Sequence, residues 1–289
     1  MSNKRTVAVT GATSGIGFAV ADLLAGQGFR VFVVGHSQEN CAAAQEKLLA
    51  AHPDAEIACF FGDLVHQREV LRVAAEIREK LARDCGGELY GLVNNAGCVR
   101  SWYMTSDEGY EQQFALNHLA GFLLTLELMP ELKKASGRVL FTASNSHRFM
   151  KMRWNDLMLQ RGYNPLTAYK QSKLANLLTA RAFNRRFGPE GVAFYCVDPG
   201  LVNTGIGCKN TGYLVNFIWS ARRKRGREPE MAARTYLYLL EGAKRDGLYF
   251  RDCAARRHSP EVCDKNALRL YEISLKLCGA GAARAEGAG

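Results

Sequence analysis

A glycine-rich turn near the N-terminus joins a short apolar strand to an apolar helix. The strand covers residues 7–10 and the helix continues to about Ala25. Glycines let the backbone approach a pyrophosphate, and the free amide groups and dipole of a helix N-terminus hold its charge. A tight strand–helix turn without a ligand would give part of this pattern, but the whole favours a dinucleotide site. Its residues would be Gly11, Thr13, Ser14, Gly15, Ile16 and Gly17.

Strands and helices alternate along the rest of the chain. Predicted strands cover 30–34, 57–61, 90–93, 137–142, 192–197 and 247–250, and predicted helices cover 39–51, 67–81, 169–187 and 228–242. This rhythm predicts an α/β fold, a Rossmann-type doubly wound parallel sheet with helices on both faces. In a chain of 289 residues we expect a single domain over 1–278, with a lid at about 201–227 and a disordered Gly/Ala-rich tail over 279–289.

In such a sheet the ligand lies at the carboxyl ends of the strands. No acidic residue follows the second strand to select NAD through the ribose hydroxyls, so His36 and Ser37 could receive a 2′-phosphate, with Arg30 or Lys4 nearby. Histidine is a weaker indication than arginine, and NAD(H) remains the alternative to NADP(H). Asp63 could meet the adenine edge or cap a helix. Further cofactor contacts are expected from Leu64, Asn94, Ala96, Gly97, Tyr169, Lys173, Pro199, Gly200, Val202 and Thr204.

Tyr169 and Lys173 lie four residues apart in a predicted helix, and hence on one face. An ammonium beside a phenol lowers the tyrosine pKa, so that the phenol can give a proton to a developing alkoxide. The motif alone is weak, because a half-buried tyrosine with a surface lysine gives the same spacing. Ser144 could hydrogen-bond a substrate carbonyl, and without a Gly-x-Ser-x-Gly elbow hydrolase chemistry is not expected. Asn117 needs a buried partner, either a neighbouring backbone or a water beside the active site.

The amino-acid composition indicates which binding partners and which cellular compartment to expect for this protein. The net charge is +10, and its basic residues are mostly spread out except at 222–227, which favours a solvated surface and a phosphorylated cofactor over nucleic acid. Nine cysteines without regular or zinc-ligand spacing predict reduced thiols in a cytoplasm and no metal site. No signal peptide, anchor or transmembrane run is expected. Residues 213–219 and the basic cluster could make a peripheral membrane contact, although a substrate lid is favoured.

These motifs together resemble the short-chain dehydrogenase/reductase family. The match runs from the 10–17 turn through Asn94-Asn95-Ala96-Gly97, Asn117, Ser144, Tyr169 with Lys173, and Pro199-Gly200, and it covers 4–279. Residues 117–125, 172–176 and 247–253, together with Ser259-Pro260, are similar to the retinol dehydrogenase-like branch, as is the separation of Ser144 from Tyr169 by 25 positions. Two departures are the missing N-terminal hydrophobic anchor and a histidine, His36, where an arginine is usual.

The resemblance implies an NAD(P)-dependent oxidoreductase that transfers a hydride between nicotinamide and a carbonyl carbon. Tyr169 would donate the proton during reduction, Ser144 would polarise the carbonyl oxygen, and Lys173 would lower the tyrosine pKa and bind the nicotinamide ribose. Asn117 would hold a water that relays protons. The apolar lid predicts a lipophilic ketone, aldehyde or alcohol, such as a steroid, retinoid or similar polycycle. A non-catalytic dinucleotide-sensing regulator is the alternative, and a homo-oligomer is compatible with the family.

Overall fold

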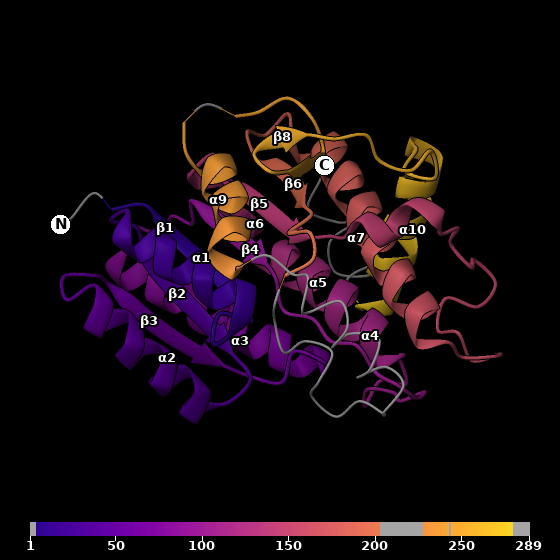
Figure 1. Cartoon of the computed structure of the whole chain (residues 1–289), viewed down its shortest axis with the longest axis horizontal. Helices are drawn as coiled ribbons and strands as arrows, with labels where there is room; N and C mark the ends of the chain where they lie inside the picture. Colours follow the sequence, from indigo (N-terminus) through magenta and orange to yellow (C-terminus); the bar gives the residue numbers. More distant parts are fainter. Residues whose placement is uncertain (1–3, 203–227, 243, 280–289) are drawn as a thin grey trace.

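The computed structural model describes residues 4–202, 228–242 and 244–279, and within them eight strands form one sheet (Figure 1). The strands lie in the order β3-β2-β1-β4-β5-β6-β7-β8. Their bounds are β1 Thr6–Thr10, β2 Arg30–Gly35, β3 Ile57–Phe61, β4 Gly91–Asn94, β5 Arg138–Thr142, β6 Ala193–Val197, β7 Tyr249–Arg251 and β8 Ala254–Ala255.

Strands β1 to β7 pair in parallel, and only the short β8 runs antiparallel, against β7. Strand β1 lies between β2 and β4, with Val7 opposite both Val31 and Gly91. The chain therefore builds the sheet outward in one direction as far as β3 and then in the other from β4. A reversal of this kind leaves a crevice at the carboxyl ends of the strands.

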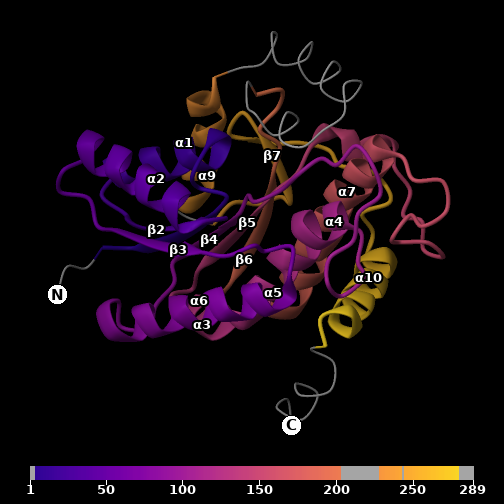
Figure 2. The same ribbon diagram turned by 90° about the horizontal axis from the view of Figure 1, so that it is seen from below.

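Helices cover both faces of the sheet (Figure 2). Helices α1, α2 and α9 lie on one face, and α3, α5 and α7 lie on the other with α10 packed outside α7. The helix bounds are α1 Gly15–Gly26, α2 Gln38–Ala51, α3 Gln67–Asp84, α4 Gln112–Phe114, α5 Ala120–Glu127, α6 Met129–Lys134, α7 Pro165–Phe187, α9 Pro229–Leu240 and α10 Asp264–Leu277, with a π-turn η1 at Ala115–Leu119 and a 3₁₀ turn η2 at Asn145–Phe149.

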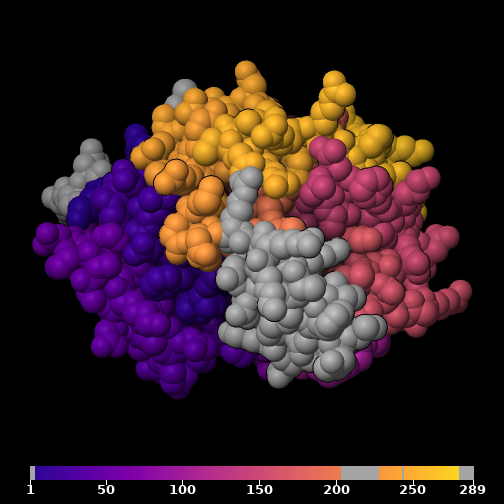
Figure 3. All heavy atoms as spheres, in the orientation of Figure 1, coloured from indigo at the N-terminus to yellow at the C-terminus, as the bar shows by residue number. Residues whose placement is uncertain are grey.

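Side-chain alternation along the strands divides the core between the two faces. In β1, Val7 and Val9 pack with α1, α2 and α9, whereas Ala8 packs on the side of α3, α5 and α7. All five residues of β1 are buried, as expected for a central parallel strand covered on both faces. In the space-filling view, the orange atoms of α9 lie next to the indigo N-terminal elements, consistent with the packing of α9 on α1 (Figure 3).

The predicted fold class is confirmed, and the predicted strands and helices are present with boundaries within a few residues, apart from the N-terminal end of α7. That helix begins at Pro165 instead of Tyr169, because Asn164 caps it and proline suits its first turn. Helices α6 and α10 and strand β8 were not predicted. The proposed lid beyond Val202, the basic cluster at 222–227 and nearly all of the tail lie outside the described residues. None of the described helices has the length and apolar character needed to cross a membrane.

Candidate active site

A cavity of about 500 Å³ lies along the carboxyl ends of the strands, where the strand order reverses. Its wall comes from the segments after β1 to β6 and from α7. The predicted site residues that line it are Gly11, Thr13, Ser14, Gly15, Ile16, His36, Asp63, Leu64, Ala96, Gly97, Tyr169, Lys173, Pro199, Gly200 and Val202. Five predicted residues are not among those that line it: Gly17, Ser37, Asn94, Asn117 and Ser144. Thr204 is outside the described residues.

The turn between β1 and α1 suits a phosphate group. Gly11 and Gly15 adopt φ values of +65° and +57°, a region that favours glycine. Ser14 is the N-cap of α1 but its side chain makes no capping bond, and the first turn has no acidic residue. The first N–H groups of α1 therefore keep their partial positive charge towards a ligand at the cavity.

Gly17 serves packing. A Cβ on Gly17 would collide with the Gly11 carbonyl and would lie 2.5 Å from Asn95 Nδ2. Asn95 itself lines the cavity, and its Nδ2 donates to the Thr10 carbonyl at 3.1 Å. The third glycine of the turn thus lets α1 approach the end of β4.

Asn95, and not the predicted Asn94, is the asparagine that faces the cavity. Asn94 Nδ2 donates to Thr125 Oγ1 in α5 at 3.0 Å. Strand alternation explains the difference, because Asn94 shares a face with Leu92, which packs on the α5 side of the sheet. Because side chains alternate between the two faces of a strand, the face of Leu92 indicates which of the two asparagines points to the cavity.

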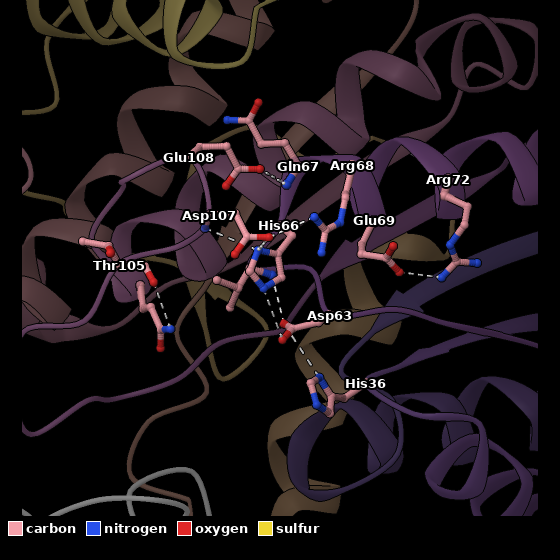
Figure 4. A network of polar contacts seen from close by, with 12 residues as sticks. His36, Asp63, His66, Gln67, Arg68, Glu69, Arg72, Thr105, Asp107 and Glu108 are labelled. Carbon is pink, nitrogen blue, oxygen red and sulfur yellow. Dashed lines mark hydrogen bonds and ion pairs between the residues drawn. The ribbon is translucent and has the colours of Figure 1, made fainter.

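The expected adenosine end contains a chain of acidic and imidazole groups (Figure 4). His36 Nδ1 lies 3.8 Å from Asp63 Oδ1, and the His36 side chain is 69% exposed. His66 lies between Asp63 and Asp107, with its Nδ1 3.1 Å from Asp107 Oδ2. Asp63 also accepts the Val65 N–H at 3.2 Å, so it stabilises the turn before α3 while facing the cavity.

Ser37 caps α2, its Oγ accepting the Asn40 N–H at 3.3 Å. The suggestion that Arg30 or Lys4 could assist a 2′-phosphate is wrong. Arg30 is the first residue of β2, whereas His36 directly follows the last, so the two residues lie at opposite ends of the strand. Both cations bind Glu56 there, with Arg30 Nη2 at 2.6 Å and Lys4 Nζ at 3.1 Å.

Tyr169 and Lys173 lie together on the cavity wall. Lys173 Nζ is 5.5 Å from the centre of the Tyr169 ring, and it donates to the Thr142 carbonyl at 3.0 Å. Only 2% of Lys173 is exposed, and this burial lowers its pKa to about 8. The lysine is therefore still mostly an ammonium at neutral pH, close to the phenol that it was predicted to assist.

Asn117 lies in the π-turn η1 behind Gly97. Its Oδ1 accepts the Cys98 N–H at 2.7 Å, and its Nδ2 donates to the Cys98 carbonyl and to Ser172 Oγ, both at 3.0 Å. Of the two partners expected for Asn117, a neighbouring backbone or a water, the structure shows the backbone. The Asn117 side chain thereby links the segment after β4 to α7. A Cβ on Gly97 would lie 2.9 Å from Asn117 Oδ1, so this approach requires glycine.

Ser144 follows β5 and caps η2, its Oγ accepting the Ser146 N–H at 3.3 Å. His147, which was not predicted, holds this turn from behind. The Ser259 N–H donates to His147 Nε2 at 3.2 Å, so the ring proton lies on Nδ1 and is donated to the Ser144 carbonyl at 2.6 Å. The imidazole is completely buried and must be neutral to make both bonds.

Three apolar residues after β4, Trp102, Tyr103 and Met104, are between 37% and 53% exposed. Tyr103 packs edge-on against Tyr163, with ring centres 5.6 Å apart. Within the described part of the chain, no cluster of three His, Cys, Asp or Glu side chains could hold a metal ion.

A model of the short chain dehydrogenase family matches residues 5–211. The chain belongs to the short-chain dehydrogenase/reductase family. It is 33% identical to human retinol dehydrogenase 13 over 290 residues, covering 95% of this chain and 85% of that protein. It is 32% identical to mouse retinol dehydrogenase 12 over 280 residues, covering 95% and 86% respectively. It is thus a retinol dehydrogenase-like member of the family and an NAD(P)-dependent oxidoreductase.

The fold is shared with solved structures. A crystal structure of an uncharacterised protein from Mycobacterium paratuberculosis superposes on the enzyme with a TM-score of 0.73 at 26% identity, covering 95% of this chain and 93% of that one. The likeness therefore includes the C-terminal elements after β6 as well as the nucleotide-binding half.

Lys173→Met should stabilise the enzyme at neutral pH. Because the folded-state pKa is lowered to about 8 from 10.5, the unfolded chain binds more protons between those pH values. The lysine therefore costs stability below pH 8, and the cost fades as the pH rises to about 10.5. We expect a gain on the order of 1–3 kcal/mol in unfolding free energy at pH 7 that shrinks at pH 10, measured by urea unfolding without cofactor.

Lys170→Met, on the same helix, is the matched control and should show no such pH-dependent gap. A Lys173→Met variant less stable than wild type at both pH values would contradict the prediction.

Burial lowers the pKa of His147 below its usual value, so its protonation is resisted in the folded enzyme. Stability should therefore fall as the pH drops from neutrality through the histidine range, because only the unfolded chain readily takes the proton. His147→Asn, which can still donate to the Ser144 carbonyl, should flatten this acid slope in thermal unfolding between pH 7 and 5.

His147→Leu leaves the Ser259 N–H unpaired and removes one of the two hydrogen bonds to the Ser144 carbonyl, which also accepts the backbone N–H of residue 147. We expect this variant to lose about 1–3 kcal/mol of stability at pH 7. An acid slope that is identical in wild type and His147→Asn would show that His147 is not the titrating group.

Proposed function

We propose that this enzyme interconverts a lipophilic ketone or aldehyde and the corresponding alcohol, with NADP(H) preferred over NAD(H). The observation that supports this most is that Tyr169 and Lys173 lie on the same cavity as the N-terminus of α1. A proton donor and a dinucleotide phosphate site thus share one crevice, as hydride transfer to a carbonyl requires.

The residues at the cavity fit a nicotinamide dinucleotide. The uncapped N–H groups of α1 and the turn at Gly11 and Gly15 would hold the pyrophosphate, Asp63 the adenine, and Pro199 and Gly200 the nicotinamide end. When bound, this cofactor supplies or accepts the hydride. Thr204, beyond the described residues, is proposed as a further contact on the family's pattern.

The protein's own groups would then handle the proton and the substrate oxygen. The Tyr169 phenol gives its proton to the oxygen, and the Ser144 hydroxyl donates a hydrogen bond to it. The Lys173 ammonium, 5.5 Å from the phenol ring, favours the phenolate and would meet the nicotinamide ribose. Because the side chain of Asn117 is occupied by Cys98 and Ser172, a relay water would be bound by main-chain groups that the π-turn releases.

A lipophilic substrate is supported by apolar side chains near the site. Trp102 is 53% exposed and Met104 38% exposed, shortly after the segment that contacts Asn117. Phe149, at the end of the turn that Ser144 begins, is 88% exposed. We propose that these side chains, which neighbour the site segments in the chain, contribute to an apolar surface for the substrate.

The preference for NADP(H) rests on the end of β2. No acidic residue follows that strand to accept the adenosine ribose hydroxyls, and His36 lies on the cavity. Asp63, 3.8 Å from His36, opposes a phosphate, so the preference should be modest.

We further propose a cytoplasmic enzyme that does not bind nucleic acid and that could form a homo-oligomer. A peripheral membrane contact through residues 213–227 remains a separate hypothesis, which binding to anionic liposomes at low salt would test.

Tyr169→Phe tests the reaction itself. Removing the phenol hydroxyl removes the proton donor, so kcat for reduction of a lipophilic aldehyde should fall by about 10²–10⁴-fold. NADPH binding, followed by nicotinamide fluorescence, should be retained within a few-fold. An unchanged kcat would disprove the role of Tyr169, and an unchanged biological effect of this inactive variant would favour the dinucleotide-sensing alternative.

His36→Asp tests the choice of cofactor. A carboxylate at this position repels a 2′-phosphate and can accept the two ribose hydroxyls. We expect wild type to bind NADPH more tightly than NADH, and the variant to reverse that order by about 10-fold or more in Kd. Tighter NADH binding by wild type would refute the NADP preference. His52→Asp, a histidine remote from the cavity, is the matched control.

A further inference from the structure

Arg100 is a cation on the wall of the cavity that the proposed reaction does not use. It lines the same space as Tyr169, Lys173, Cys98 and Leu116. Its Nε donates to Gln112 Oε1 at 2.9 Å. Across the described residues, its two terminal nitrogens have no hydrogen-bond or ion-pair partner.

The backbone of Arg100 and the Nε edge of its guanidinium are each held by hydrogen bonds. The Arg100 carbonyl lies 3.2 Å from the Tyr163 hydroxyl and 3.5 Å from Gln113 Nε2, which fixes its backbone. Gln112, which fixes the Nε edge, is itself anchored through its Nε2 on the Thr105 carbonyl at 3.3 Å. The position of the charge is therefore set by the protein before a ligand binds.

Glu111, a buried carboxylate that interacts electrostatically with Arg100, makes its hydrogen bonds to other groups. Glu111 is 1% exposed, and its two oxygens accept the N–H groups of Gln113 and Phe114 at 3.0 and 2.7 Å, with the Tyr163 hydroxyl at 3.2 Å. Burial raises the pKa of Glu111, while its hydrogen bonds and the charge of Arg100 act in the opposite direction. The sequence from 203 to 227 contains no aspartate or glutamate that could provide a counter-ion.

We propose that Arg100 determines substrate specificity by binding a carboxylate on the substrate. A guanidinium whose Nε edge is already occupied still presents the edge formed by its two terminal nitrogens, and this edge matches the two oxygens of a carboxylate. Trp102 and Met104 follow in the chain as exposed apolar groups, suited to a hydrophobic body. The substrate class is then an oxo acid or hydroxy acid with an apolar body, and this rests on the proposed carbonyl reduction.

The test compares ω-oxo fatty acids of 8, 10 and 12 carbons, on the order of the span of a cavity of this size, with their methyl esters. The two series differ only in the charge at the far end. Wild type should prefer the acid over its ester by about 10- to 100-fold in kcat/KM for the best chain length. Arg100→Met should reduce that preference to about one, and Arg100→Lys should give an intermediate value because its ammonium lacks the fork geometry.

Arg161→Met, an exposed arginine in the segment before α7 that does not line the cavity, is the matched control and should keep the wild-type preference. NADPH affinity should be the same in wild type and Arg100→Met. If the variant instead loses NADPH affinity, Arg100 binds the cofactor and the proposal is wrong. Equal turnover of acid and ester by wild type also overturns it, while leaving the proposed reaction intact.

If no oxo compound is reduced, a binding assay tests the carboxylate site at Arg100 independently of the proposed carbonyl reduction. Decanoate and decanamide would be titrated into the NADPH complex, following nicotinamide fluorescence. Tighter binding of decanoate that disappears in Arg100→Met supports the carboxylate site even without turnover. Equal binding of the two probes, or a preference that survives the substitution, refutes it.

Discussion

Thr142, at the carboxyl end of β5, holds the residues around Lys173 in place through both its carbonyl and its hydroxyl. Its carbonyl accepts Lys173 Nζ at 3.0 Å and Asn176 Nδ2 at 3.2 Å, so two residues of α7 are fixed to the sheet by one oxygen. Its hydroxyl lies 2.8 Å from the Tyr236 hydroxyl of α9 and 3.2 Å from Asn95 Oδ1. Elements on both faces of the sheet therefore meet at this residue, and the position of the lysine relative to the phenol depends on it.

A buried ammonium is costly, and the fold accepts this cost at the site where a charge is useful. Lys173 has one carbonyl acceptor and no carboxylate partner within salt-bridge distance in the part of the chain that is described. A carboxylate would stabilise the ammonium but would also neutralise its effect on the phenol. A carbonyl dipole holds the group in place while leaving the charge available, which is a usual compromise between stability and activity.

The sequence predicted what depends on local pattern and could not predict what depends on packing between distant segments. The glycine turn, the alternating strands and the Tyr169–Lys173 spacing are set within a few residues, and the ends of parallel strands then bring them together. Asn95 lines the cavity where Asn94 was predicted, because the side chain of Asn94 points to the α5 face of the sheet. Arg30 is the first residue of β2, so it lies at the end of the strand away from the cavity. The bond from Ser259 to His147 spans 112 positions, and nothing local to either residue indicates it.

Several positively charged groups lie along the cavity. Positive groups come from the N-terminus of α1, from Lys173 and from Arg100. Two carboxylates also belong to this region: Asp63 lies 3.8 Å from His36 and 3.9 Å from His66, and the buried Glu111 accepts backbone N–H groups. An anionic dinucleotide would use the N-terminus of α1 and Lys173, whereas the proposed reaction has no role for Arg100. Because a guanidinium edge without a partner in a partly enclosed space is unfavourable, the proposed carboxylate on the substrate would satisfy the terminal nitrogens of Arg100.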